Sequence, residues 1–299
     1  MGLPNVLVVA QGKGGVGKTS LAANLAGLIA AAGRRVLIVD LDQQANLRRE
    51  LGTEYDDGRA LFTAVSNTSR PPITQNVRER LDMVPGGPAV ADLVFVMIGR
   101  LGADGGHTPT DLIANTLATV ADDYDLVIVD TPPGERVMVE AAMGAARWLV
   151  IPTAADEGSI DGLQLTAKRF VNARQVNPDL QLLGVVLFGI SAQSKTIERD
   201  TRRTIEGLIG SAGPVCAARI RHQAAPAVDA RRQGLLIHEL EQRVADAKSH
   251  RLARLSGRGQ DHASVDLRTR DAKGLGDDYW ALTNEILAAM KASLTGVSA

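Results

Sequence analysis

The chain has 299 residues that are 45% hydrophobic, 22% charged and only 3% aromatic, which predicts a globular protein with an aliphatic core. Its formal net charge of −1 argues against a protein that is basic throughout, although a local basic patch is compatible with that total. The single cysteine, Cys216, excludes an internal disulfide and any multi-cysteine metal or cluster site within one chain.

Short apolar runs alternate with longer segments of helical period along the chain. We predict buried strands at Val6–Ala10, Arg35–Asp40, Leu81–Val84, Leu126–Asp130, Trp148–Pro152 and Leu182–Phe188. Between the first two, an apolar face from Leu21 to Ala32 predicts a helix that begins near Lys18 and ends at Gly33. This alternation predicts an α/β fold with a mostly parallel central sheet flanked by helices on both faces. Ligands of such sheets bind at the carboxyl ends of the strands.

Two stretches are less regular. Residues 52–80 are polar, and we expect only a short helix around Arg59 to Val65. Residues 241–278 hold many charges, few large apolar groups and four glycines, so we expect a helix at first and then a mobile excursion. A final amphipathic helix is expected at about 279–292. We expect residues 1–299 to form a single domain.

No segment has the length of a membrane span. The longest nearly apolar stretch, Leu21 to Ala32, is about 12 residues long, whereas a span needs about 20. Residues Met1 to Asn5 carry no basic segment of the kind that opens a signal peptide. We therefore expect a cytoplasmic protein.

A glycine-rich loop follows the first predicted strand and matches the pattern G-x-x-x-x-G-K-[ST], which is typical of P-loop NTPases. Glycines allow backbone N–H groups to surround phosphate oxygens, and the following helix directs its N-terminus at the same anion. Lys18 is expected to pair with the β- and γ-phosphates, and the Thr19 hydroxyl to bind Mg²⁺. The alternative, a glycine-rich turn that binds nothing, is disfavoured because strand, loop and helix occur in order. The residues expected to contact ATP are Gly12, Lys13, Gly14, Gly15, Val16, Gly17, Lys18, Thr19 and Ser20.

Aspartates stand at the ends of two further strands. Asp40 could orient or deprotonate the attacking water, and Asp42 could shape a loop that senses the nucleotide or serve only as a turn former. Asp130 ends an apolar strand, where it could hold Mg²⁺ through water or merely cap a turn. Pro132 and its neighbours form a stiff bend that we interpret as a second nucleotide-sensing segment.

The second loop lysine, Lys13, makes residues 13–19 resemble the deviant Walker A motif K-G-G-x-G-K-[ST] of the ParA/MinD family. Residues 40–46 resemble that family's D-x-D-P-Q-x-N motif, with Gln43 in place of the proline. Residues 151–163 and 220–234 are similar to two further family segments. The resemblance covers about three quarters of the chain and is closest to ParA-type DNA-partitioning ATPases without an N-terminal helix-turn-helix. Departures are Gln43, Arg48 in place of a small hydroxyl residue, and the 241–278 excursion.

The resemblance implies a biological role. In the family, the lysine equivalent to Lys13 reaches the nucleotide of the other subunit, and Mg-ATP drives homodimer formation. The dimer binds DNA without sequence preference, and a ParB-like partner stimulates a slow hydrolysis, so that plasmid or chromosomal DNA is segregated. A nucleoid-associated location follows from this reading.

A basic stretch is compatible with DNA binding. Residues 195–232 contain eight Lys or Arg and four acidic residues, a local excess that suits phosphate contacts whose strength falls with salt. The alternative is a solvated helical face. The candidates for DNA contact are Arg199, Arg202, Arg203, Arg219, Arg221, Arg231 and Arg232.

Three other functions share this loop. A positioning ATPase for another cargo cannot be separated from a DNA-partitioning ATPase by sequence. A MinD-like membrane-associated division-site regulator is disfavoured, because Lys291 is the sole basic residue of 277–299, so no stable membrane association is expected. A relative of the nitrogenase iron protein would need paired cysteines.

Overall fold

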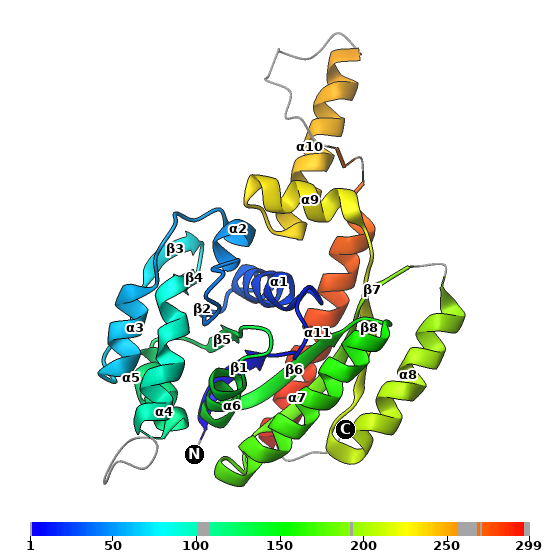
Figure 1. Ribbon diagram of the computed structural model, residues 1–299. Helices are drawn as coiled ribbons and strands as arrows, with labels where there is room; N and C mark the ends of the chain where they lie inside the picture. Colours follow the sequence, from blue (N-terminus) through cyan, green and yellow to red (C-terminus); the bar gives the residue numbers. More distant parts are fainter. Residues whose placement is uncertain (1, 101–107, 192–193, 256–267, 270, 296–299) are drawn as a thin grey trace.

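The computed structural model describes residues 2–100, 108–191, 194–255, 268–269 and 271–295 (Figure 1). Within them, one sheet has the strand order β3-β4-β2-β5-β1-β6-β7-β8. All pairings are parallel except that of β3 with β4. The strands are β1 (Leu3–Val9), β2 (Val36–Asp40), β3 (Thr74–Arg78), β4 (Leu81–Val84), β5 (Leu126–Asp130), β6 (Ala146–Thr153), β7 (Gln181–Ile190) and β8 (Val215–Arg221). The predicted α/β fold is confirmed.

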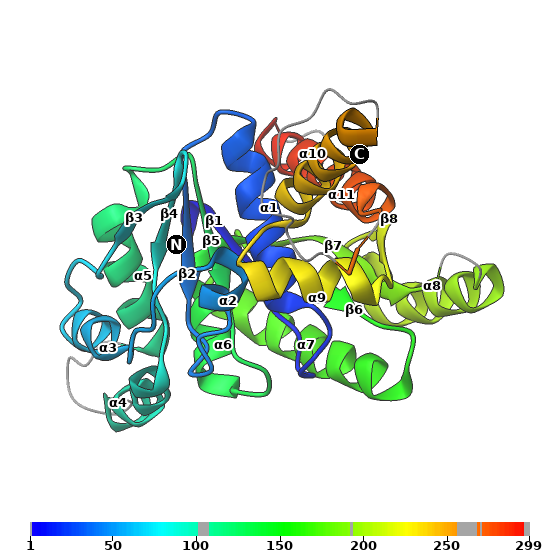
Figure 2. The same cartoon turned by 90° about the horizontal axis from the view of Figure 1, so that it is seen from above.

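Helices cover both faces of the sheet (Figures 1 and 2). They are α1 (Lys18–Ala31), α2 (Leu47–Leu51), α3 (Arg59–Ser66), η1 (Pro88–Asp92), α4 (Leu93–Arg100), α5 (Pro109–Ala121), α6 (Arg136–Ala145), α7 (Glu157–Val176), α8 (Lys195–Ile209), η2 (Gly210–Ala212), α9 (Ala224–Gln233), α10 (Ile237–Leu255) and α11 (Lys273–Thr295). None of them, as far as the chain is described, combines the length and apolar character that a membrane span requires.

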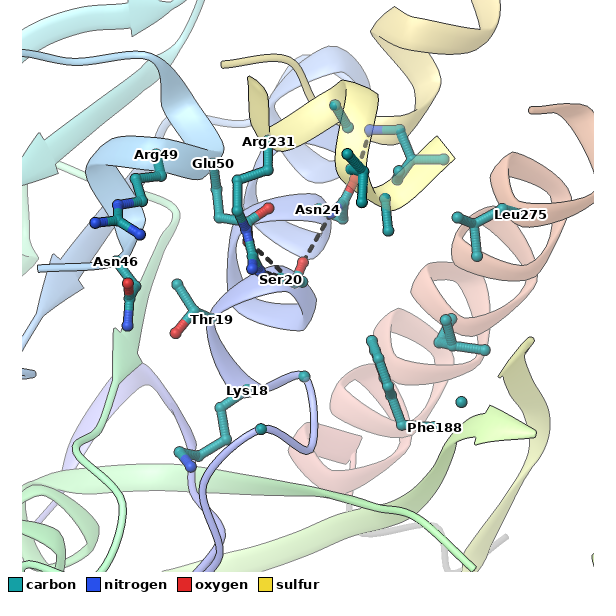
Figure 3. Close-up of a pocket in the computed structure, with 18 of the residues that line it drawn as sticks. Lys18, Thr19, Ser20, Asn24, Asn46, Arg49, Glu50, Phe188, Arg231 and Leu275 are labelled. Carbon is teal, nitrogen blue, oxygen red and sulfur yellow. Dashed lines mark hydrogen bonds and ion pairs between the residues drawn. The ribbon is translucent and has the colours of Figure 1, made fainter. Parts of the chain in front are cut away.

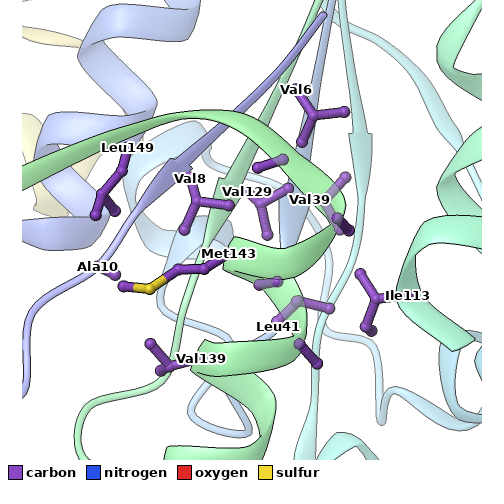
Figure 4. Close-up of a cluster of buried hydrophobic side chains, with 14 of the residues drawn as sticks. Val6, Val8, Ala10, Val39, Leu41, Ile113, Val129, Val139, Met143 and Leu149 are labelled. Carbon is purple, nitrogen blue, oxygen red and sulfur yellow. The ribbon is translucent and has the colours of Figure 1, made fainter. Parts of the chain in front are cut away.

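Two aliphatic cores lie on opposite faces of the sheet. Val6 and Val8 of β1 point to one face, where they pack with residues of α5 and α6 such as Ile113 and Met143 (Figure 4). Leu7 and Val9 alternate to the other face, in a core that also holds side chains of α1, α10 and α11. The central strands are therefore apolar on both sides, which is why their sequences read as continuous hydrophobic runs.

Several sequence expectations need correction at their boundaries. The six predicted strands exist, but β3 and β8 had no apolar signal: β3 is largely polar, and basic residues interrupt β8. The short helix near Arg59 is present as α3. The last helix begins at Lys273 rather than 279. Its Gly274 packs under the guanidinium of Arg221, where a Cβ would lie 2.5 Å from Nη1, so this glycine allows close packing within the helix rather than forming a loop. Residues 256–267 of the predicted excursion lie outside the described residues.

The two edge strands of the sheet differ in their surroundings. Along β8, the Glu285 carboxylate of α11 accepts hydrogen bonds from the backbone N–H groups of Ala217 (2.7 Å) and Ala218 (2.8 Å), and Asp278 accepts from Arg221 N–H (2.9 Å). At the opposite edge, β3 is short, antiparallel and irregular in its register.

Candidate active site

A cavity of about 770 Å³ lies beside the carboxyl ends of the central strands, between α1, α2, α9 and α11 (Figure 3). The phosphate loop, the Asp42 loop and Pro133 line one end of it. Phe188, which packs against Gly17 of this loop, also lines the cavity, with Ile220, Leu275 and Tyr279. The cavity thus offers polar groups from the loop together with apolar side chains suited to a flat ring.

The loop before α1 has the backbone shape of an anion cradle. Gly15 (φ 78°) and Gly17 (φ 85°) adopt left-handed conformations that glycine favours. A Cβ on Gly17 would meet the Phe188 ring at 2.3 Å, so no larger residue fits there. Among the described residues no side chain caps the N-terminus of α1, which leaves its first backbone N–H groups available to a ligand.

Lys18 folds back over this loop. Its Nζ donates a hydrogen bond to the Lys13 carbonyl oxygen (2.9 Å), and the side chain is mostly buried. Burial lowers the pKa of Lys18, whereas Asp130 and Asp42 raise it. A triphosphate would add negative charge, which favours the ionised form of this buried ammonium.

Asp130 has the surroundings of a ligand-binding carboxylate. It is fully buried, and neither carboxylate oxygen has a hydrogen-bond partner among the described residues. Burial raises its pKa to about 7, although the neighbouring Thr19 hydroxyl and Lys18 lower it. No cluster of three or more His, Cys, Asp or Glu in the described chain could hold a metal alone. A cation placed between Thr19 and Asp130 would therefore take further ligands from phosphate and water.

Asp40 and Asp42 have different surroundings. Strand pairing sets Asp40 opposite Asp130, and burial followed by that neighbouring charge raises its pKa well above the usual range. Its oxygens accept from the N–H groups of Asp42 (2.9 Å) and Leu47 (3.3 Å), so it anchors the loop. Asp42, not Asp40, lines the cavity. The sequence favours Asp40 as the carboxylate that orients or deprotonates the attacking water, and in the structure the carboxylate that lines the cavity is that of Asp42.

Lys13 is held within its own chain. Its ammonium forms an ion pair with Asp156, the N-cap of α7, whose carboxylate also accepts from Ser159 N–H (3.1 Å) and Ser159 Oγ (2.7 Å). The hydrogen bond from Lys13, followed by those from Ser159, lowers the pKa of Asp156 to about 2. Sequence reasoning missed this partner, although an Asp three residues before a Ser at a helix start is an N-cap signal.

Helix α7 also supports the phosphate loop and the segment after β5. Thr166 Oγ1 accepts a hydrogen bond from Gly12 N–H (2.9 Å), and Gly162 packs against the loop. Farther along, Arg169 Nη2 donates to the Gly134 carbonyl oxygen (2.7 Å). One helix therefore contacts both loops that surround the phosphate end.

A buried carboxylate joins α2 to its neighbours. Glu50 accepts hydrogen bonds from Ser20 Oγ (2.8 Å) and from Arg231 Nη2 (2.6 Å) and Nε (3.0 Å). Ser20, expected at the nucleotide, does line the cavity, but its hydroxyl faces Glu50 (Figure 3).

Most arginines proposed for DNA contact have acidic partners. These are Asp200 for Arg199, Glu198 for Arg202 and Arg219, Asp278 for Arg221, Glu50 for Arg231 and Asp229 for Arg232. Arg202 also donates to the carbonyls of Cys216 (2.5 Å) and Ala217 (2.9 Å), so it supports β8. Arg199 and Arg203 are exposed on α8 with Lys195.

Comparison with known proteins finds a matching family model and several similar sequences and structures. A family model described as an AAA domain matches residues 4–182. The chromosome partitioning protein ParA of Myxococcus xanthus is 31% identical over 185 residues, which span 61% of this chain and 64% of that protein. The structure of apo McdA from Cyanothece has a TM-score of 0.69 at 22% identity, covering 79% of this chain and 92% of that one. A cobyrinic acid a,c-diamide synthase from Mycobacterium smegmatis with bound ADP and magnesium has a TM-score of 0.65 at 25% identity, with 89% and 99% covered.

Proposed function

The chain belongs to the ParA/MinD family of P-loop ATPases, and from this premise we propose that it binds Mg-ATP, hydrolyses it and forms a homodimer in response to it. The observation that carries the proposal is the combination of a glycine-shaped loop at the start of α1 with the fully buried carboxylate of Asp130, whose oxygens have no hydrogen-bond partner among the described residues. Such an arrangement costs free energy without a ligand, and a magnesium-bound triphosphate supplies the missing partners.

Each group at the phosphate end has a distinct task in this proposal. Backbone N–H groups of residues 14–19 surround the phosphates, and Lys18 neutralises them. Thr19 and Asp130 hold Mg²⁺, which when bound offsets phosphate charge. Asp42 faces the cavity and orients the attacking water, whereas Asp40 anchors the loop that presents Asp42.

The proposed dimer explains Lys13. An ammonium paired with an exposed Asp156 is not committed to its own nucleotide and can be released at small cost. Two chains facing each other across their cavities would exchange these lysines. Asp156 then serves as the resting partner of Lys13 before ATP is bound.

We further propose that the dimer binds DNA without sequence preference and segregates plasmid or chromosomal DNA with a ParB-like partner that stimulates hydrolysis. The exposed face of α8, with Lys195, Arg199 and Arg203, is the surface best placed for phosphate contacts. Arg202 and Arg219 pair with Glu198 of α8, whereas Arg221 pairs with Asp278 of α11 and is not part of this surface.

Calorimetry tests the nucleotide site. Wild type should bind Mg-ATP, and a Lys18→Ala variant should bind it at least about tenfold more weakly, because a charge-assisted contact to phosphate is lost. Equal binding by both proteins would refute the site. Retention on non-specific DNA, measured with and without ATP across a salt series, tests the partitioning role. If retention changes with neither ATP nor salt concentration, the partitioning role is excluded.

A further inference from the structure

Arg49 supplies a cation to the cavity that the phosphate-loop pattern does not include. It lies in α2, directly after the Asp42 loop, and its side chain lines the cavity with Thr19 and Asn46 (Figure 3). The preceding Arg48 does not line it and instead places its guanidinium 5.5 Å from the centroid of the Tyr55 ring. Two consecutive arginines of one short helix therefore face different surroundings.

The rotation of α2 fixes this difference. Leu47 and Leu51 are fully buried, and Glu50 is nearly so because it binds Arg231 and α1. Successive helical residues lie about 100° apart, so burying these three leaves the outer side to the two arginines. Turning α2 to withdraw Arg49 would break the contacts of Glu50.

Arg49 has no acidic partner among the described residues, because no ion pair includes it and the adjacent Glu50 is engaged by Arg231. It is exposed to the cavity and lies with Thr19 and Asn46, whereas Phe188, which suits a base, lies across the cavity from it (Figure 3). The free fork of a guanidinium matches the oxygens of a phosphate.

We infer that Arg49 contacts the terminal phosphate of ATP bound in its own chain. The inference rests on the proposed nucleotide site and adds to it a residue that distinguishes ATP from ADP. Binding of the terminal phosphate would thereby hold α2 and the Asp42 loop at the cavity, so that the loop senses whether that phosphate is present.

Binding of two nucleotides by matched variants tests this. The probes are Mg²⁺ with a non-hydrolysable imido analogue of ATP, or with ADP, titrated by calorimetry into wild type, Arg49→Ala, Arg49→Lys and the control Arg48→Ala. We expect Arg49→Ala to bind the analogue about ten- to a hundredfold more weakly, as for a lost charge-assisted hydrogen bond, while ADP binding changes less than about threefold. Arg49→Lys should fall between, since it keeps the charge without the fork. Arg48→Ala should bind both like wild type.

Two results would overturn the inference: analogue binding by Arg49→Ala equal to that of Arg48→Ala, or an equal loss for the analogue and for ADP. Thermal melts should show that both alanine variants are folded, since both side chains lie on the outer side of α2. If wild type bound neither nucleotide, or Lys18→Ala bound as wild type does, the proposed function itself would fail. These two sets of outcomes therefore distinguish a failure of the Arg49 inference from a failure of the proposed nucleotide site.

Discussion

Replacing Asp156 with Asn should strengthen the ATP-dependent dimer, because it frees Lys13 from its partner in the same chain. The Asn side chain can still accept from Ser159 N–H, and Asn is as good an N-cap as Asp, so α7 should remain intact. The ion pair is partly solvated, with side chains 39% and 52% exposed, which limits its worth to about 0.2–1 kcal/mol. Two such pairs must open per dimer, so we expect a dissociation constant about 2- to 30-fold lower.

Sedimentation equilibrium with Mg²⁺ and a non-hydrolysable ATP analogue at pH 7.5 measures this. With a pKa of about 2, Asp156 is ionised there; its stabilising effect would be lost only as pH falls from about 4 toward 2. Ser159→Ala is the matched control, since it weakens the cap without changing charge. A dimer of Asp156→Asn no tighter than wild type, or a persistent ATP-dependent dimer in Lys13→Ala, would refute the reasoning.

Three further predictions concern the site and its supports. Asp130→Asn should melt at a higher temperature than wild type at pH 8 in EDTA. Burial raises the Asp130 pKa to about 7, so the unfolding free energy of the wild type falls by up to about 4 kcal/mol as pH rises from about 4 to 7. The same variant should gain little from Mg-ATP, and a lower melting temperature in EDTA would contradict this prediction. Arg202→Ala should lower the unfolding free energy by about 1–3 kcal/mol in urea melts, because the hydrogen bonds to two backbone carbonyls are lost. Arg203→Ala should weaken DNA retention and change the unfolding free energy by less than about 0.5 kcal/mol. The opposite pattern would count against the α8 surface as the site of DNA contact. Gly162→Ala should weaken ATP binding in calorimetry, since its Cβ would lie 2.9 Å from Lys13 N. Gly99→Ala, whose Cβ would meet no atom of the described residues within 4 Å, should bind as wild type does.

The central sheet could be predicted from the sequence because its strands are buried on both faces. Runs such as Leu126 to Asp130 are continuously apolar and end in a single charge, a pattern that is typical of a buried parallel strand whose tip reaches a ligand site. Strand β8 escaped detection because it lies at an edge, where one side of the strand carries polar residues such as Arg219. The glycines near 274 indicate a loop in the sequence, whereas in the structure they allow close packing of α11.

The phosphate end of the site followed from local spacing, but its supports did not. Lys13 and Asp156, or Glu50 and Arg231, are far apart in sequence and meet only through the fold. The orientations of Asp40 and Asp42 depend on which side chain the loop turns inward, and two backbone hydrogen bonds decide that. Neither these long-range contacts nor these side-chain orientations can be inferred from the spacing of residues in the sequence.

The carboxylates of Glu285 and Asp278 along β8 have a consequence for the behaviour of the protein at high local concentration. They occupy main-chain donors that would otherwise recruit a strand from a neighbouring molecule. These hydrogen bonds therefore deny cross-β growth a template at that edge of the sheet. Charge-neutral substitutions at Glu285 would then be expected to show their effect first as turbidity in concentrated stocks.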